Sequence, residues 1–530
     1  MKHSFYEANA RERVLGVLDP GSFRELLPPV ERVVSPHLPH LDLPVAFDDG
    51  VVVGSGTLDG HPVLAASQEG GFMGGAVGEV HGAKLTGLFE RAVDEKPAAV
   101  LLILESGGVR LHEANAGLIA VSETMRALLN ARAAGVTALA LIGSTYGCFG
   151  GMGLVAKCCD LVIMSEEGRL GMSGPEVIET AHGVEEFDSR DRALVWRTVG
   201  GKHRYLMGDA KQLVEDDIVA FRSAAIRASV PGSPSRSKPS PRSTSPSPSA
   251  STVSVNAATP STSGARWEWR RPKRCRSWRR RPFSPSPTAC GRGTDVDSHE
   301  LLAGLFPAGH EVRQEGDLLS GTGTVAGSPV AVAGTTNHAA IGVELAFALA
   351  DFILQVVREH PGRPILLLVD TQGQRLRHRD ELLGINAYMA HLAKCIELAR
   401  RAGHRVISLV YGRAVSGGYI TGGMMADACF ALADAEISVM NLPAMARVTK
   451  IAQERLAELA KTSPVFAPGA ENYFKMGALD SLWSGNLAEA LATALRGSNT
   501  QDRRRELGAE RGGRNLALRV AERVKGDAPQ

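Results

Sequence analysis

Two glycine pairs stand at matching places in the two halves of this 530-residue chain. Gly150-Gly151 follows the apolar run LALIGSTYGCF, and Gly417-Gly418 follows ISLVYGRAVS. Each pair opens a segment of helical composition, where the first backbone N–H groups have no intrahelical acceptor and the helix dipole is positive. Because glycine lets a ligand approach the backbone closely, we predict a site for an oxygen that becomes negatively charged, such as a thioester enolate. A single motif would more simply be a tight turn, but two copies favour a site.

A second pair of motifs comes earlier in each half. ESGGVRL (105–111) and DTQGQRL (370–376) each end an apolar strand. In open α/β sheets, ligands bind beyond the carboxyl ends of the strands. Arg110 and Arg375 are therefore candidates to bind a carboxylate or a phosphate, and an ion pair with a local acid is the alternative interpretation.

Residues 98–175 and 363–443 repeat one order of motifs at an offset of 265–268 residues. A repeat of domain length predicts two lobes of one fold, covering 45–220 and 310–495. It also predicts that a site made by the fold is made twice, with the two copies facing each other.

The elements that must position these motifs alternate between strand and helix. VLLILES and ILLLVDT read as continuous apolar strands, helices are expected over 82–95 and 340–358, and Gly135 and Gly403 suit the ends of the following helices. This alternation indicates an α/β fold with a parallel sheet covered by helices. Near the N-terminus, Ser22 is expected to cap a helix.

The segment 224–298 differs from both lobes. It is rich in Ser and Pro, then in Arg and Trp, and up to residue 294 it holds fourteen basic residues and one acid, which leaves the rest of the chain at a net charge of −11. Because this composition cannot bury a core, a disordered linker is the main interpretation. An arm that binds nucleic acid through Arg and Trp is the alternative. The same composition also fits a frame-shifted stretch between two joined genes.

Other classes of protein are disfavoured by absences in the sequence. The start has no apolar signal-peptide core, no run of about 18 apolar residues predicts a membrane span, and the seven cysteines form no Cys-x-x-Cys motif. Four histidines near the motifs show no metal-ligand spacing: His81, His112, His338 and His378. We therefore expect a cytoplasmic protein with reduced thiols, no bound metal, no membrane contact and no nucleic acid.

At these residues the chain resembles a known family. ESGGVRL, with GGAVGEVHGAKLTGLFERA before it and the glycine-rich turn after it, is similar to the carboxyltransferase branch of the crotonase superfamily. Within that branch the chain resembles the β and γ subunits of biotin-independent malonate decarboxylase joined in one chain. The β-like part covers 1–223, the segment 224–298 follows, the γ-like part covers 299–500, and 501–530 is a charged tail. The resemblance implies two crotonase-like lobes with an active site between them.

The resemblance also implies a reaction, decarboxylation of a malonyl thioester to an acetyl thioester and carbon dioxide through an enolate held by backbone N–H groups. It implies no covalently bound cofactor, since a separate acyl-carrier-protein subunit supplies a phosphopantetheine-type arm derived from dephospho-CoA. An acyl-transferase subunit exchanges the acyl group, and we expect a homo-oligomer of the fused chain. The candidate catalytic residues are Gly107, Gly108, Gly150, Gly151, Gly417 and Gly418. The candidate substrate-binding residues are Lys84, Arg110, Tyr146, Arg375 and Tyr419.

Two further roles are assigned as hypotheses. Candidate proton donors are Tyr146, Cys148 and Tyr419. Candidate docking residues for the carrier protein at the strand ends are Lys84, Arg110, Arg375 and Arg377. Two other functions stay open: biotin-dependent carboxyl transfer from a malonyl thioester, with biotin on another subunit, and a non-catalytic role in assembling a complex.

Overall fold

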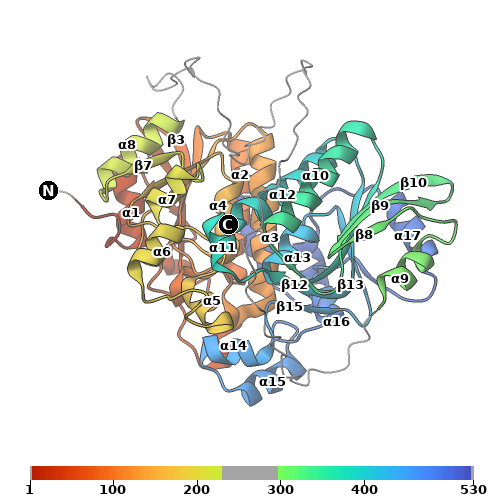
Figure 1. The fold of residues 1–530 in the computed structure, drawn as a ribbon. Coiled ribbons are helices and arrows are strands. Elements are labelled where there is room, and N and C mark those ends of the chain that lie inside the picture. The colour runs from red at the N-terminus through yellow and green to blue at the C-terminus, as the bar shows by residue number, and fades with distance from the viewer. Residues whose placement is uncertain (1–2, 230–295, 527–530) are drawn as a thin grey trace, which may run out of the picture.

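The computed structural model describes residues 3–229 and 296–526, which form two lobes (Figure 1). The red-to-yellow N-terminal part of the chain builds the first lobe, and the green-to-blue part builds the second. Most of the predicted linker lies outside the described residues, and so do its frame-shift and nucleic-acid interpretations. Its first residues, 224–229, belong to the last helix of the first lobe.

The first lobe spans the chain up to residue 229. Its helices are α1 (Ala10–Val17), α2 (Glu79–Glu95), α3 (Ala114–Ala133), α4 (Gly150–Cys158), α5 (Pro175–His182), α6 (Arg192–Val199), α7 (Gly201–Leu206) and α8 (Ile218–Ser229), with short 3-10 helices at Pro29–Glu31, Leu38–Leu41, Met73–Gly75 and Leu111–Glu113. Its strands are β1 (Arg24–Leu26), β2 (Val51–Leu58), β3 (His61–Gln68), β4 (Ala99–Ile103), β5 (Ala138–Ile142), β6 (Leu161–Ser165) and β7 (Gln212–Val214).

The second lobe and the C-terminal helices follow. The helices are α9 (Ser298–Leu305), α10 (Val343–Glu359), α11 (His378–Leu382), α12 (Ile385–Arg401), α13 (Ser416–Gly422), α14 (Leu442–Thr449), α15 (Gln453–Thr462), α16 (Ala470–Lys475), α17 (Leu487–Arg496), α18 (Arg504–Glu510) and α19 (Ala517–Lys525). The strands are β8 (Arg313–Glu315), β9 (Leu318–Val325), β10 (Ser328–Thr335), β11 (Ala339–Ile341), β12 (Ile365–Gln374), β13 (Val406–Val415), β14 (Ala428–Leu432), β15 (Glu436–Ser438) and β16 (Ser481–Trp483). Among the described residues, no helix is both long and apolar enough to cross a bilayer.

The two sheets have the same strand order. In the first, antiparallel β1, β2 and β3 lead into parallel β3, β4, β5, β6 and β7. In the second, antiparallel β8, β9 and β10 lead into parallel β10, β12, β13, β14 and β16, with β11 beside β12 and β15 beside β13. The predicted α/β fold, made twice, is confirmed.

The central strands are buried on both faces, which explains their continuous apolar sequence. In β4, Leu101 and Ile103 pack into the core beneath α1 and α8, while Val100 and Leu102 face the core beneath α2 and α3. β12 lies in the same way between α9 and α17 on one face and α10 and α12 on the other. The strands therefore hold their carboxyl ends, where both motifs lie, in fixed positions.

The inner faces of the two lobes form one continuous apolar core. It includes Val121 of α3 and Met389 of α12. α4 packs on α12, and α3 packs on α13, so the helices that begin at the glycine motifs lie on the boundary between the lobes.

The C-terminal end of the chain returns to the first lobe, where α19 packs on α2. Gly87 permits this close approach, because a Cβ at that position would lie 2.4 Å from the Ala521 carbonyl oxygen. Glu79 of α2 accepts the N–H groups of Leu516 (2.9 Å) and Ala517 (3.0 Å) at the start of α19. The segment expected as a charged tail thus contains two helices, and one of them is capped by the first lobe.

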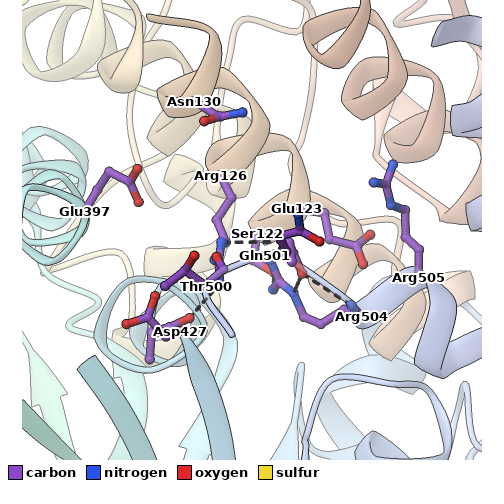
Figure 2. A network of polar contacts seen from close by, with 12 residues as sticks. Ser122, Glu123, Arg126, Asn130, Glu397, Asp427, Thr500, Gln501, Arg504 and Arg505 are labelled. Carbon is purple, nitrogen blue, oxygen red and sulfur yellow. Dashed lines mark hydrogen bonds and ion pairs between the residues drawn. The ribbon is translucent and has the colours of Figure 1, made fainter. Parts of the chain in front are cut away.

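Figure 2 shows where the chain crosses between the lobes before α18. Arg126 of α3 donates to the carbonyl oxygen of Thr500 (3.2 Å), and Arg400 of α12 donates to the same oxygen (2.9 Å). Arg504 of α18 donates to Ser122 Oγ on α3. One short stretch of backbone therefore contacts a helix of each lobe.

The expectation of a helix capped by Ser22 is wrong. Arg24–Leu26 is the edge strand β1, paired antiparallel with β2. Ser22 Oγ accepts the N–H of Thr57 (3.1 Å) instead of capping a helix. Pairing with a neighbouring strand decided the structure of this short segment, whose helical spacing was only a weak local preference.

Candidate active site

A buried carboxylate ends the second parallel strand of each sheet. Glu105, after β4, accepts the N–H of Tyr146 (3.1 Å). Asp370, at the matching place in β12, accepts the N–H groups of Arg413 (2.8 Å) and His338 (2.7 Å). The carboxylate therefore fixes the segment that leads to the glycine-rich turn, a loop in the first lobe and the end of β13 in the second.

Beyond each carboxylate the backbone folds back on itself. The Gly108 N–H donates to Ser106 Oγ (3.1 Å), and the Gly373 N–H donates to Thr371 Oγ1 (3.0 Å). The φ angles are +108° at Gly108 and +100° at Gly373, in a region that residues with a side chain rarely adopt. The Gly107 N–H donates to a neighbouring carbonyl (2.8 Å), so it is already engaged.

The loop at Gly108 lies against the first glycine turn (149–151). A Cβ on Gly108 would lie 3.0 Å from Gly150 Cα and 3.4 Å from Gly151 N, so this approach requires glycine. Gly150, with φ +58°, donates its N–H to the Met172 carbonyl (2.8 Å). The Gly151 N–H lies in the first turn of α4, where the helix supplies no acceptor. The two first-lobe motifs thus come together in one place.

The second glycine turn (415–417) matches the first with a one-residue shift from the sequence pairing. Ser416, with φ +50°, begins α13 as Gly150 begins α4. Gly417 therefore corresponds to Gly151, and the pairing of Gly150 with Gly417 is off by one residue. Ser416 carries a side chain at a strained backbone angle, of a kind that gathers at functional sites.

The two turns approach each other through Met172 of the first lobe. A Cβ on Gly417 would lie 2.3 Å from Met172 Cε, which places the methionine methyl against the second turn. The Met172 carbonyl accepts the Gly150 N–H of the first turn. Gly418 faces its own lobe, since a Cβ there would lie 2.9 Å from Thr371 Oγ1. Met172 thus lies between the turns at the lobe boundary.

The two motif arginines have different surroundings. Arg110 is buried and pairs with Asp49 (2.7 Å) and Glu113 (2.5 Å). This ion pair with local acids contradicts the prediction that Arg110 binds substrate or docks a carrier protein. Arg375 is partly exposed and lies 4.0 Å from Glu344, so it stays a candidate, as does the exposed Arg377.

Lys84 is not an exposed residue at the strand ends. Its side chain is buried on α2, and Nζ donates to the carbonyl oxygens of Asp48 (2.7 Å), Val51 (3.3 Å) and Leu27 (3.4 Å). Burial lowers the pKa of the Lys84 amine. The prediction that Lys84 docks a carrier protein is therefore wrong, because the amine holds three loop carbonyls together.

The candidate proton donors differ in their access to water. Tyr419 is fully buried, packs edge-on against Tyr473 with ring centroids 6.2 Å apart, and has a pKa raised well above its usual value by burial. Burial also raises the pKa of the Cys148 thiol. Tyr146 is 49% exposed. Of the three, Tyr146 combines exposure with a backbone fixed by a strand-end carboxylate.

Three residues at the lobe boundary were missed from the sequence. Glu381 of α11 accepts the N–H groups of Met172 and Ser173, more than 200 positions away, and no local sequence pattern predicts such a contact. No sequence pattern marks Met172 either. Gln374 could have been noticed, because it stands where the first motif has an apolar residue. Its buried Oε1 has no hydrogen-bond partner among the described residues and lies 3.1 Å from where a Cβ on Gly417 would be.

A polar groove of about 570 Å³ lies apart from these turns, in the region of Figure 2. Arg401 on its wall pairs with Glu397 (2.6 Å), and Arg505 pairs with Glu90. Because these arginines of the groove already pair with carboxylates, the groove does not form an anion-binding site. In the described part of the chain, no cluster of His, Cys, Asp or Glu is arranged to hold a metal ion.

The fold is thus one α/β lobe made twice, with strained strand-to-helix turns meeting across the boundary. Comparison with family models identifies the class of protein. Residues 4–271 match the model described as carboxyl transferase domain, and residues 336–528 match malonate decarboxylase gamma subunit. The chain belongs to the carboxyl transferase family and is a carboxyltransferase-like enzyme.

Two curated relatives come from Malonomonas rubra. The malonyl-S-ACP:biotin-protein carboxyltransferase MADC is 50% identical over 233 residues, which cover 41% of this chain and 73% of the relative. MADD, which carries the same enzyme description, is 35% identical over 151 residues, which cover 27% of this chain and 52% of the relative. The chain thus spans about half the length of the second relative.

Among solved structures, one similar chain comes from a Pseudomonas malonate decarboxylase hetero-tetramer in complex with malonate. It is 43% identical and covers 44% of this chain and 86% of its own, with a TM-score of 0.43.

Proposed function

We propose that this chain removes the carboxylate of a malonyl thioester as a component of a malonate decarboxylase. The observation that carries the proposal is the meeting of the Gly108 loop with the first glycine turn, where a Cβ on Gly108 would lie 3.0 Å from Gly150 Cα. The Gly151 N–H lies beside this contact at the positive end of α4, and its place in the first helical turn leaves it with no acceptor from the helix.

The chemistry needs no nucleophile from the chain. The bond between the α-carbon and the carboxylate breaks, carbon dioxide leaves, and the electron pair moves onto the thioester carbonyl to give an enolate. The Gly151 N–H at the first glycine turn, at the positive end of α4, stabilises that oxygen in a site shielded from water. A proton then adds to the α-carbon and gives the acetyl thioester. The second glycine turn faces the departing carboxylate.

The acyl group arrives from outside the chain in this proposal. A separate acyl-carrier-protein subunit presents malonate on a phosphopantetheine-type arm, and an acyl-transferase subunit exchanges the acyl group. The name of the relative MADC, malonyl-S-ACP:biotin-protein carboxyltransferase, supports a malonyl-S-ACP substrate. Arg375 and Arg377, on the exposed side of the second lobe, are the basic residues that we assign to carrier docking.

A second candidate is transfer of the carboxyl group to biotin on a partner protein. The specific observation in its favour is the 50% identity to a relative named as a biotin-protein carboxyltransferase. The first half-reaction, cleavage to an enolate, is the same in both candidates. They differ in whether the carboxyl group is released or captured.

One assay separates the candidates. The purified chain is mixed with malonyl-loaded acyl-carrier protein, and carbon dioxide release is followed with and without avidin. Release that is indifferent to avidin supports decarboxylation. Carboxyl transfer that requires a biotinylated acceptor and stops with avidin supports the second candidate. Absence of both reactions contradicts both and leaves the assembly role.

A further inference from the structure

Glu381 makes an unusual contact across the lobe boundary. It lies on α11 of the second lobe and is fully buried. Its carboxylate accepts the N–H of Met172 at Oε2 (3.0 Å) and the N–H of Ser173 at Oε1 (2.5 Å), and both donors belong to the first lobe. Both oxygens are thus held by the backbone of the other lobe.

Among residues 3–229 and 296–526, no basic side chain donates to the Glu381 carboxylate. The Arg204 guanidinium donates to the Glu381 backbone carbonyl (2.7 Å) and pairs with Asp209 (3.2 Å). Burial of a carboxylate without a direct cationic partner is costly. Consistent with this, burial raises the pKa of Glu381 above its ordinary value. Burial alone gives no reason to place a carboxylate here, so its role must lie in the backbone that it holds.

The residue that Glu381 holds is the one that lies between the glycine turns. The Met172 carbonyl accepts the Gly150 N–H (2.8 Å) of the first turn. The Met172 methyl lies 2.3 Å from where a Cβ on Gly417 would be, in the second turn. The neighbouring Gly171 N–H donates to the Cys148 carbonyl (3.1 Å), which connects the same segment to the residues just before α4.

We propose that Glu381 is a positioning residue that sets the spacing and orientation of the two glycine turns by holding Met172 between them. The hydrogen bonds of the Glu381 carboxylate go to Met172 and Ser173, which lie outside both turns. Its effect passes through the backbone of Met172 to Gly150 and through the Met172 side chain to Gly417. The catalytic consequence rests on the proposed function, whereas the positioning does not.

Glu381→Met is the main test variant, because a hydrophobic side chain of similar length removes the buried charge and both acceptors. The substitution leaves the Met172 and Ser173 N–H groups without their acceptor, so some loss of stability is expected with it. Glu381→Gln keeps one acceptor oxygen and should give an intermediate result. The matched control is Asp480→Asn in the second lobe, which alters a carboxylate that also accepts a backbone N–H, from Cys429 (2.8 Å).

Two readouts are needed on the full chain. Hydrogen exchange of peptides covering 147–153 and 414–419 should become at least about fivefold faster in Glu381→Met and stay unchanged in Asp480→Asn. With malonyl-carrier protein, kcat should fall about tenfold or more in Glu381→Met while KM changes by less than about twofold, and Asp480→Asn should keep the wild-type kcat. A role in folding alone would instead lower the midpoint of thermal unfolding without this split between kcat and KM.

Unchanged exchange at both turns in Glu381→Met and Glu381→Gln would overturn the proposal. A response at one turn only would also overturn it, since Met172 contacts both. If the wild-type chain shows no activity on the thioester but both peptides respond, the proposed function fails and the positioning role stands.

Discussion

At the scale of single residues, adjacent glycines in one motif have different tasks. A Cβ on Gly107 would meet only the Gly74 carbonyl oxygen, at an ordinary 3.7 Å. A Cβ on Gly108 would press on Gly150, and φ at Gly108 is +108°. Substitutions at Gly107 and Gly108 therefore form a matched pair for testing whether the contact between the Gly108 loop and the first glycine turn is needed for turnover.

Gly108→Ala should lower turnover of the malonyl thioester by about 100-fold, because moving the loop away from the first glycine turn displaces an oxyanion donor. The strained backbone should also cost about 1–3 kcal/mol of stability. Steady-state kinetics with circular dichroism on the folded variant checks this. Gly107→Ala should keep turnover within a few-fold of wild type, and equal losses in both variants would contradict the assignment.

Asp49 gives a pH test at the same scale. It shares Arg110 with Glu113, and burial raises its pKa to about 6. The folded state therefore holds a proton that the unfolded chain releases near pH 4. The stability from this group is fully present below about pH 4 and is lost as the pH rises through about 6.

Asp49→Asn should accordingly remove the part of the pH dependence of stability that comes from this carboxyl group. In urea unfolding, the free energy of the wild type relative to that of the variant should fall as the pH rises from about 4 to about 7. A difference that stays constant over this range would show that Asp49 titrates normally.

At the scale of elements, a buried ion pair attaches the C-terminal helices to the first lobe. Arg514, between α18 and α19, donates to both carboxylate oxygens of Glu123 on α3 and is fully buried. Arg519, on α19, is exposed. The two arginines are only five positions apart, so burial is the main difference between them.

Arg514→Met should lower the free energy of unfolding by about 3–5 kcal/mol, because it leaves Glu123 buried without its partner. Arg519→Met should stay within about 0.5 kcal/mol of wild type. Chemical denaturation of both variants measures the difference. Equal stability of the two variants would mean that Glu123 finds another partner.

How far the sequence predicts these elements depends on how local their causes are. The strand and helix order followed from apolar runs such as 100–104, because burial on both faces leaves a clear pattern. The glycine motifs were recognisable because backbone geometry demands that residue type. Lys84 and Arg110 were misplaced because the carbonyls around Lys84, and Asp49 beside Arg110, lie far off in the sequence. Glu381 was missed for the same reason. Glu113, three residues after Arg110, is a local acid that favoured the ion-pair interpretation.

At the scale of the whole molecule, the lobes associate through surfaces that do not depend on the segment between them. Asn115 of α3 donates to the carbonyl oxygens of Pro464 (2.9 Å) and Ala467 (2.8 Å), and Tyr473 donates to Asn115 (2.8 Å). With the shared apolar core, these contacts join the lobes directly.

Residues 1–229 and 296–530, expressed as two polypeptides in one cell, should therefore purify as a stable complex. Size-exclusion chromatography with mass analysis detects it. A second polypeptide that ends at residue 498 and lacks α18 and α19 should bind the first more weakly. Separate elution of the two full-length parts would show that the covalent connection is essential.

The placement of α19 has a consequence for the order in which the protein is made. During synthesis α2 leaves the ribosome well before α19, the helix that covers it with buried Val520, Ala521 and Val524. Until the second lobe and α19 have been made, the first lobe keeps an apolar helix surface uncovered, and Glu79 lacks the backbone N–H groups that it accepts. A nascent chain that stops short of α19 therefore presents this surface to chaperones and proteases.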